Sequence, residues 1–230
     1  MNGQDSPKAV VAVGGKPMAA RVVEAMRGAG VTRIVVVIGH RGQDVQAAVG
    51  NHVEYVVQEE QLGTGHAVLQ AEAALSGYAG PVVVTYADIP LLRGDDISLL
   101  VAHHRATGAA ATLLTAVFED PGTLGRIVRQ ESGAVEAIVE AKDATPEQLA
   151  IKEINAGIYC FEAPLIFDVL RLVTNKNAQH QYYLTDAIAI LIKKGKLVEA
   201  VAMEFAYAGI GVNTPADLDH ARRLVAASEA

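Results

Sequence analysis

Residues 81–88, PVVVTYAD, form an apolar run that ends abruptly at Tyr86 and Asp88. A valine-rich run of this kind is typical of a strand that is buried on both faces. Similar runs occur at 33–40 (RIVVVIGH) and 52–58 (HVEYVVQ), and each is followed by a segment with helical periodicity. This alternation of strands and helices predicts a largely parallel sheet covered by helices, and therefore an α/β fold.

After about residue 109 the apolar segments lie closer together, with only turns between them. The segments at 111–118, 125–130 and 134–141 predict an antiparallel excursion, with a hairpin turn at the residues ESG, 131–133. The rest of the chain predicts a strand at 153–161, helices at 164–173 and 183–195, a strand at 197–203 and a helix from Pro215 to about Ala227. We therefore expect one domain with a mixed, mostly parallel sheet.

The charge balance argues against a nucleic-acid or membrane partner. The chain has 19 Lys and Arg against 26 Asp and Glu, a net charge of −7, and the charges are intermixed along the chain. The single cysteine, Cys160, lies in the apolar run GIYCF and is expected to be a buried thiol. With neither a signal peptide nor a long apolar segment, the chain is expected to be soluble and cytoplasmic.

Three polar clusters stand next to predicted strands: QEEQLGTGH after 52–58, YAD at the end of 81–88, and EIN at 153–155. In open parallel sheets, ligands bind beyond the carboxyl ends of the strands. We therefore expect the three clusters to share one cleft.

In the first cluster, Gly63 and Gly65 flank Thr64, which could cap the following helix. Glycines let a backbone approach a ligand closely, and amides such as Gln58 can pair with a nucleobase edge. A glycine-bracketed turn is also common without any ligand, so both interpretations stay open.

Asp88 follows a buried strand directly, where an unpaired carboxylate is costly. A Mg²⁺ ion would provide a partner, and a cap on the turn before Pro90 is the alternative. The run GGKP at 14–17 lacks the pattern of a phosphate loop and predicts a turn before a helix. The histidines His66, His103, His104 and His180 do not have metal-site spacing and are expected to be solvated or capping residues.

Eight segments, taken in order, are more specific than any one of them: SPKAVVAVGGKPM, QEEQLGTGHAV, YADIPLL, LGRIV, IVEAKDAT, EINAGIY, NAQHQYYLTDAI and GVNTPADL. Over about residues 1–227, the chain resembles the N-terminal uridylyltransferase domain of bacterial N-acetylglucosamine-1-phosphate uridylyltransferases. The resemblance implies a Rossmann-like nucleotide-diphospho-sugar transferase fold. It also implies that UTP and N-acetylglucosamine 1-phosphate react to UDP-N-acetylglucosamine and pyrophosphate, with Mg²⁺ as cofactor.

The resemblance also implies the contact residues. The uracil would be contacted by Gln58, Gly63 and Thr64, and the sugar-nucleotide site would be lined by Tyr86, Ala87 and Asp88. The sugar, its N-acetyl group and the ribose would be held by Gly125, Glu140 and Asn155. Mg²⁺ would be bound by Asp88 and Asn213, and a phosphate by Lys8. Lys8 and Asp88 are the expected catalytic residues, and a homo-oligomer is compatible with the resemblance.

Several positions depart from the family pattern. Ala87 stands where glycine is usual, and Leu124 stands where tyrosine is usual before Gly125. The residues GVNTP at 211–215 replace the usual GVNNR, and Ala208 replaces an acidic residue. These differences leave open which sugar 1-phosphate the chain uses.

Family members begin with an apolar strand and a glycine-rich loop that ends G-x-G-T-R-M, and Met1 aligns with the last residue of that loop. The hypothesis is that Met1 is an internal methionine or that the chain is a truncated relative. We expect residues 1–230 to form one nucleotidyltransferase domain without the family's β-helix acetyltransferase domain, and we expect no acetyl transfer.

The loop's backbone amides would hold the nucleotide phosphates, so activity without them is an open question. Two alternatives to the leading function follow. The chain could use another sugar 1-phosphate or nucleotide, or it could bind a sugar nucleotide without catalysis.

Overall fold

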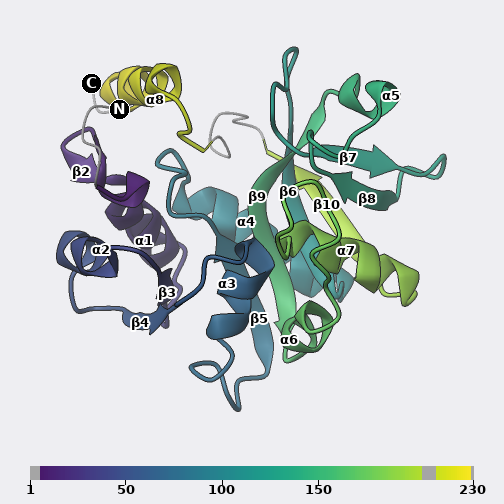
Figure 1. Ribbon diagram of the computed structural model, residues 1–230, viewed down its shortest axis with the longest axis horizontal. Coiled ribbons are helices and arrows are strands. Elements are labelled where there is room, and N and C mark those ends of the chain that lie inside the picture. The colour runs from purple at the N-terminus through teal and green to yellow at the C-terminus, as the bar shows by residue number, and fades with distance from the viewer. Residues whose placement is uncertain (1–5, 204–210, 229–230) are drawn as a thin grey trace.

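The computed structural model describes residues 6–203 and 211–228 (Figure 1). Met1, which aligns with the end of the family's loop, and Ala208 lie outside these ranges. None of the described helices combines the length and the apolar character that are needed to cross a bilayer.

The described part of the chain begins with the 3-10 turn η1 (Lys8–Val10) and a small hairpin of β1 (Ala12–Val13) and β2 (Lys16–Pro17). Gly14 and Gly15 make its turn, with φ of 56° and 74°. Helix α1 (Met18–Gly28) follows directly, so the predicted turn before a helix is confirmed for Gly14 and Gly15, whereas Lys16 and Pro17 belong to β2.

The last helix, α8 (Pro215–Ser228), packs on this hairpin, as Figure 1 shows. Val13 and Met18 share an apolar cluster with Val212, Leu218 and Val225. Both ends of the described chain are therefore held at one edge of the molecule, which brings the region of Lys8 close to the residues just before α8.

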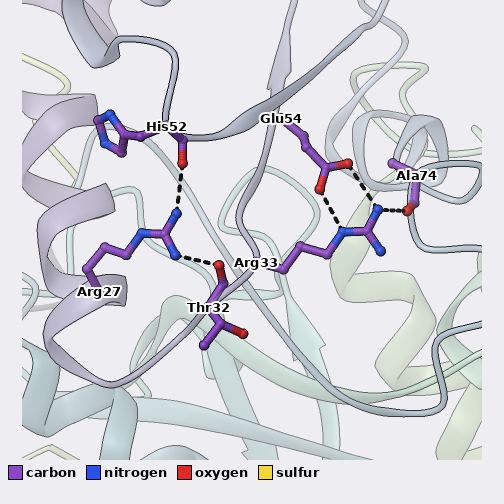
Figure 2. Close-up of polar contacts among 6 residues, drawn as sticks. All are labelled: Arg27, Thr32, Arg33, His52, Glu54 and Ala74. Carbon is purple, nitrogen blue, oxygen red and sulfur yellow. Dashed lines mark hydrogen bonds and ion pairs between the residues drawn. The ribbon is translucent and has the colours of Figure 1, made fainter.

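Strands β3 (Val35–Ile38) and β4 (Glu54–Val57) form a parallel two-stranded sheet, connected by α2 (Gly42–Val49). Two arginines tie this sheet to its surroundings (Figure 2). Arg27, at the end of α1, donates to the carbonyls of Thr32 and His52. Arg33 forms a two-pronged ion pair with Glu54 and also reaches the carbonyl of Ala74.

The larger sheet has six strands: β5 (Gly80–Thr85), β6 (Ala111–Val117), β7 (Arg126–Arg129), β8 (Val135–Val139), β9 (Glu153–Ala163) and β10 (Val198–Ala202). Strand β9 lies in the middle, with β6 along one edge and β5, then β7, along the other. Since β5, β6 and β7 all run antiparallel to β9, and β10 runs parallel to β6, these four strands share one direction. The mixed sheet is therefore confirmed, including the β7–β8 hairpin, although the pairings of β9 with its neighbours are antiparallel and β6–β10 is the parallel pairing among these strands.

The remaining helices are α3 (Thr64–Gln70), α4 (Gly94–Thr107), α5 (Pro146–Leu149), α6 (Leu165–Leu170) and α7 (Leu184–Lys193). Figure 1 shows α6 and α7 against one face of the large sheet, and α4 lies on the other. Strand β9 is buried on both faces, because Phe161 packs with the α6 and α7 side while Ile158 packs with the α1 and α4 side. Burial of each such side chain stabilises the fold by about 1.5–3 kcal/mol.

Cys160 and His104 both lie in this core, but only the burial of Cys160 was predicted from the sequence. Cys160 is buried as expected, and burial raises the pKa of its thiol to about 12, so it stays protonated. The prediction that His104 is solvated or a cap is wrong, because its ring is buried between Thr112 and Glu162 and hydrogen-bonds with both. These partners lie on β6 and β9, and Glu162 is 58 residues away from His104 in the sequence.

Candidate active site

The site lies where β5 ends. Because β9 runs antiparallel to β5, the beginning of β9 comes to the carboxyl end of β5, and Asn155 reaches the neighbourhood of Tyr86. Strand β5 pairs with β9 only from Ile158 onward, and β7 pairs with it at Ile154. The segment of β9 between these pairings borders the site.

On one side of the site is the loop from Gln58 to Gly65. The Nε2 of Gln58 donates to the carbonyl of Gly63 at 3.1 Å and contacts Nδ1 of His66 at 2.9 Å. Both hydrogens of this amide are therefore directed at protein atoms, and its Oε1 is the atom that can accept a hydrogen bond from a ligand. His66 is half-buried and holds Gln58, which corrects the expectation that it is solvated or a cap.

The same loop is fixed against the start of α7. Gly65 donates its N–H to the carbonyl of Tyr182 at 2.8 Å, and Gly63 has a φ of 119°. A Cβ on Gly63 would lie 2.6 Å from the carbonyl oxygen of Tyr182. The position therefore requires glycine for two reasons: its backbone conformation is unfavourable for other residues, and there is no room for a side chain.

Thr64 does not cap α3, which is a correction. Its Oγ1 instead accepts a hydrogen bond from the backbone N–H of Leu184, the first residue of α7, at 3.0 Å. That N–H has no partner within its own helix, and Thr64 supplies one from a distant loop.

At the end of β5, the phenol of Tyr86 lies near Thr64 and near Tyr159 of β9. Burial raises the pKa of Tyr86 to about 12, and the negative charge of Glu140 adds to the effect. Its phenol therefore stays protonated and acts as a hydrogen-bond group rather than as a base.

The third group lies where the β7–β8 hairpin meets α7. Gly125 accepts the backbone N–H of Asn155 at 2.9 Å, and the Glu140 carboxylate lies next to it. Thr185 donates its hydroxyl to Oε1 of Glu140 at 3.0 Å. Burial raises the pKa of Glu140 above its usual range, and the charges of Asp143 and Asp186 act in the same direction.

The fourth group joins Lys8, Asp88 and Asn213. The ammonium of Lys8 forms an ion pair with the carboxylate of Asp88 and donates to Oδ1 of Asn213 at 2.8 Å. The backbone N–H of Val212 donates to the carbonyl of Asp88 at 2.8 Å, which fixes the two segments together. Asp217 holds the N–H of Asn213 at 2.9 Å.

These oxygens suit a hard cation, because Asp88 and Asn213 supply a carboxylate and an amide oxygen that already face one positive charge. Within residues 6–203 and 211–228, no group of three or more His, Cys, Asp and Glu side chains is arranged to hold a metal ion. A cation here would be held by few protein ligands, as is usual where phosphate oxygens complete the coordination.

The structure thus gathers the residues singled out in the sequence, and it gives two of the departures from the family pattern apolar surroundings. Ala87 packs against the apolar cluster of α1, α2 and β3, so its methyl group is partly buried there. Leu124 packs likewise against the cluster of α1 and α4. The functional roles of these residues remain predictions.

Sequence reasoning missed Thr185 and Tyr159. Thr185 lies in the segment NAQHQYYLTDAI, which formed part of the resemblance but was given no role. Tyr159 lies inside an apolar strand pattern, which predicts a core residue at this position. The one available signal was the polar hydroxyl in an otherwise apolar run, since a buried tyrosine needs a hydrogen-bond partner.

A family model described as nucleotidyl transferase matches residues 3–213. The chain belongs to this family. It is 46% identical over 211 residues to the bifunctional protein GlmU of Exiguobacterium sp., which covers 92% of this chain and 47% of that protein. It is 44% identical over 215 residues to the GlmU of Pelobacter propionicus, covering 93% of this chain and 47% of that protein. The chain therefore spans about half the length of these curated relatives.

Solved structures give the same fold at lower identity. A UDP-glucose pyrophosphorylase complexed with UDP-glucose has a TM-score of 0.77 and 18% identity, covering 98% of this chain and 92% of that chain. A protein described as a glucose-1-phosphate thymidylyltransferase from Bacillus anthracis has a TM-score of 0.76 and 21% identity, covering 96% and 87%. These likenesses establish the Rossmann-like nucleotidyltransferase fold.

Proposed function

We propose that this chain is a single nucleotidyltransferase domain that transfers a uridylyl group from UTP to N-acetylglucosamine 1-phosphate. The products would be UDP-N-acetylglucosamine and pyrophosphate. The main observation in support of this proposal is that the residues assigned by motif lie around the end of β5, where hydrogen bonds and ion pairs hold them. The identity to GlmU proteins supports the same function.

The Gln58 loop suits a uracil. Uracil carries an N–H between two carbonyls, and the Oε1 of Gln58 is the acceptor that this amide can offer, since its nitrogen contacts Gly63 and His66. The fixed backbone around Gly63 and Thr64 would lie against the base. A cytosine presents an acceptor in place of that ring N–H, so the site would discriminate against it.

The opposite side of the site suits the sugar. Gly125 presents a surface without a side chain, and Glu140 beside it offers carboxylate oxygens to hydroxyl or amide hydrogens. The raised pKa of Glu140 reflects a poorly hydrated carboxylate, which would gain from hydrogen bonds to a polyhydroxy ligand.

Lys8, Asp88 and Asn213 would contact the phosphates. Asp88 and Asn213 would hold Mg²⁺, which when bound neutralises charge on the phosphates. In the reaction, an oxygen of the sugar phosphate forms a bond to the α-phosphorus of UTP, and the bond from that phosphorus to pyrophosphate breaks. Lys8 would stabilise the negative charge on the phosphate oxygens, and no protein nucleophile is required.

Pyrophosphate release from UTP and N-acetylglucosamine 1-phosphate in the presence of Mg²⁺ tests the proposal. We expect release to be faster than with glucose 1-phosphate, and faster with UTP than with dTTP. Faster release with another sugar would assign a different substrate. Background release together with UDP-sugar binding would instead identify a binding protein without catalysis.

Asp88→Asn provides the control for this assay. It keeps the shape of the side chain and removes its charge, so we expect a loss of turnover of about 10²-fold or more. Retained turnover would remove Asp88 from the phosphate and Mg²⁺ site.

A further inference from the structure

Strand β9 carries a bulge beside the site. Leu113 of β6 pairs with Tyr159, and Thr115, only two residues further on, pairs with Asn155. Four steps along β9 thus match two along β6. Gly157, in the middle, has a φ of 73°, which is the left-handed region that favours glycine. Bulges of this kind are common next to active sites, where they redirect side chains.

The bulge brings together two side chains that a regular strand would keep apart. Residues four positions apart in a regular strand are separated by about 13 Å. Here the Nδ2 of Asn155 donates to the hydroxyl of Tyr159 at 2.5 Å. The Oδ1 of Asn155 accepts the backbone N–H of Gly157 at 3.1 Å, so the amide is held at both ends and its orientation is fixed.

The hydroxyl of Tyr159 continues the network into the rest of the site. Since its oxygen accepts from Asn155, its own hydrogen can be donated onward, and Tyr86 is the polar group that lies near it. Tyr86 also lies near Thr64, whose oxygen holds the N–H of Leu184. Neighbouring polar side chains therefore lead from Asn155 to Thr64 in the Gln58 loop.

Tyr159 itself does not line the site, because its exposed fraction is 0%. Its ring stacks on Phe161, with 5.7 Å between the ring centroids, inside the core of α6 and α7. A ligand at the end of β5 would meet Asn155 and Tyr86, which are less buried. Any effect of Tyr159 on a ligand must therefore act through those two side chains.

We propose that Tyr159 is a positioning residue that sets the orientation of the Asn155 amide for the sugar 1-phosphate. The inference rests on the proposed function, because it assigns Asn155 to the sugar side of the site. The family resemblance suggests that assignment, and the backbone bond between Asn155 and Gly125, next to Glu140, supports it. The phenol in the core thus provides part of the selectivity of a site that it does not touch.

Tyr159→Phe tests this role because it removes the hydroxyl and keeps the ring in place. We expect the KM for N-acetylglucosamine 1-phosphate to rise about fivefold to tenfold, the equivalent of one hydrogen bond. The KM for UTP and the kcat should stay within about twofold, because Leu184 still holds Thr64.

Tyr55→Phe is the matched control. The hydroxyl of Tyr55 donates to the carbonyl of Gly50 at 2.5 Å, outside the network described above. This variant also loses one hydrogen bond made by a tyrosine hydroxyl, and its KM values for UTP and for N-acetylglucosamine 1-phosphate should match those of the wild type. Equal sugar-phosphate KM values for Tyr159→Phe and wild type would overturn the proposal, as would equal effects of the two variants on that KM.

A second measurement separates this inference from the proposed function. The side-chain amide signals of Asn155 in a ligand-free 15N NMR spectrum should shift in Tyr159→Phe and stay in place in Tyr55→Phe. If the wild type neither turns over nor binds UDP-N-acetylglucosamine, the proposed function fails, and these signals decide the role of Tyr159. A shift specific to Tyr159→Phe would support positioning of Asn155, and unchanged signals would overturn it.

Discussion

Lys8 forms an ion pair with Asp88 at the point where the 3-10 turn near the beginning of the chain meets the end of β5. Their side chains are 33% and 22% exposed, so the pair is partly shielded from water and from screening by salt. Asn213, which lies 205 residues after Lys8, accepts from the same ammonium at 2.8 Å. The ammonium thus contacts both residues that were predicted to hold Mg²⁺.

This arrangement predicts competition between Lys8 and a divalent cation. Lys8→Gln removes the positive charge, so the oxygens of Asp88 and Asn213 become more available to a metal ion. We expect ligand-free Lys8→Gln to bind Mn²⁺ more tightly than the wild type in a titration followed by electron paramagnetic resonance. Turnover should nevertheless fall about 10²-fold, because the ammonium of Lys8 no longer balances the negative charge on the phosphates.

Lys16→Gln is the control for this experiment, because Lys16 is exposed and pairs with Glu24 on the surface. Both its Mn²⁺ affinity and its turnover should match the wild type. Weaker or unchanged Mn²⁺ binding in Lys8→Gln would contradict the competition.

The loop at Gln58 gives a prediction about nucleotide choice. Gln58→Ala removes the acceptor that is available to the ring N–H of uracil, while cytosine has no such hydrogen to donate. We expect the preference for UTP over CTP, measured as the ratio of kcat/KM values, to fall about tenfold or more. Gln43→Ala, at an exposed position on α2, should keep the ratio. An unchanged preference in Gln58→Ala would remove Gln58 from base recognition.

The sequence predicted the elements of this fold well because each depends on local pattern. Apolar runs identified β3, β4, β5 and β9, and their polar ends identified the site. The direction of β9 could not be obtained in this way, since an apolar strand has the same pattern in either direction. That direction is what brings Asn155 to the end of β5.

The contacts that shape the site were unpredictable for a related reason. Thr64 was a possible cap for its own helix, and its partner Leu184 lies 120 residues further along the chain. His104 was expected to be solvated or a cap, and its buried ring instead contacts Glu162, 58 residues away. Such pairings are set by the packing of whole elements, and side-chain chemistry alone gives no indication of which distant residue will be near.

Gly157 allows a test of the bulge in β9. A Cβ at this position would lie 2.6 Å from Cε2 of the Tyr86 ring, and the φ of 73° is unfavourable for any other residue. Gly157→Ala should therefore lower the free energy of unfolding by about 3 kcal/mol or more, as measured by urea denaturation. The Tyr86 ring would also have to move out of its place.

Gly133→Ala separates the two causes. Gly133 lies in the hairpin turn with a φ of 86°, and a Cβ there would meet no atom within 4 Å. This variant carries only the conformational cost, so its loss should be about 1 kcal/mol. Equal losses in the two variants would show that the ring of Tyr86 does not restrict Gly157.

Glu140 gives the final prediction, which concerns pH. Burial raises its pKa in the folded state above the unfolded value, so the folded protein binds the proton more tightly. The stability associated with this group is therefore greatest below the unfolded pKa and decreases as the pH rises through the folded pKa. Asp186, whose pKa burial also raises, contributes a dependence of the same sign.

Glu140→Gln keeps an oxygen that can accept from Thr185 and removes the titration. Its free energy of unfolding, measured in urea between about pH 4 and pH 8, should therefore decrease less with rising pH than that of the wild type. The difference between the two proteins should be small at acidic pH, where the wild-type carboxyl is protonated, and should grow toward neutral pH in favour of the variant. A constant difference over the whole range would contradict the raised pKa, and a difference that grows in favour of the wild type would show that the charged carboxylate stabilises the fold.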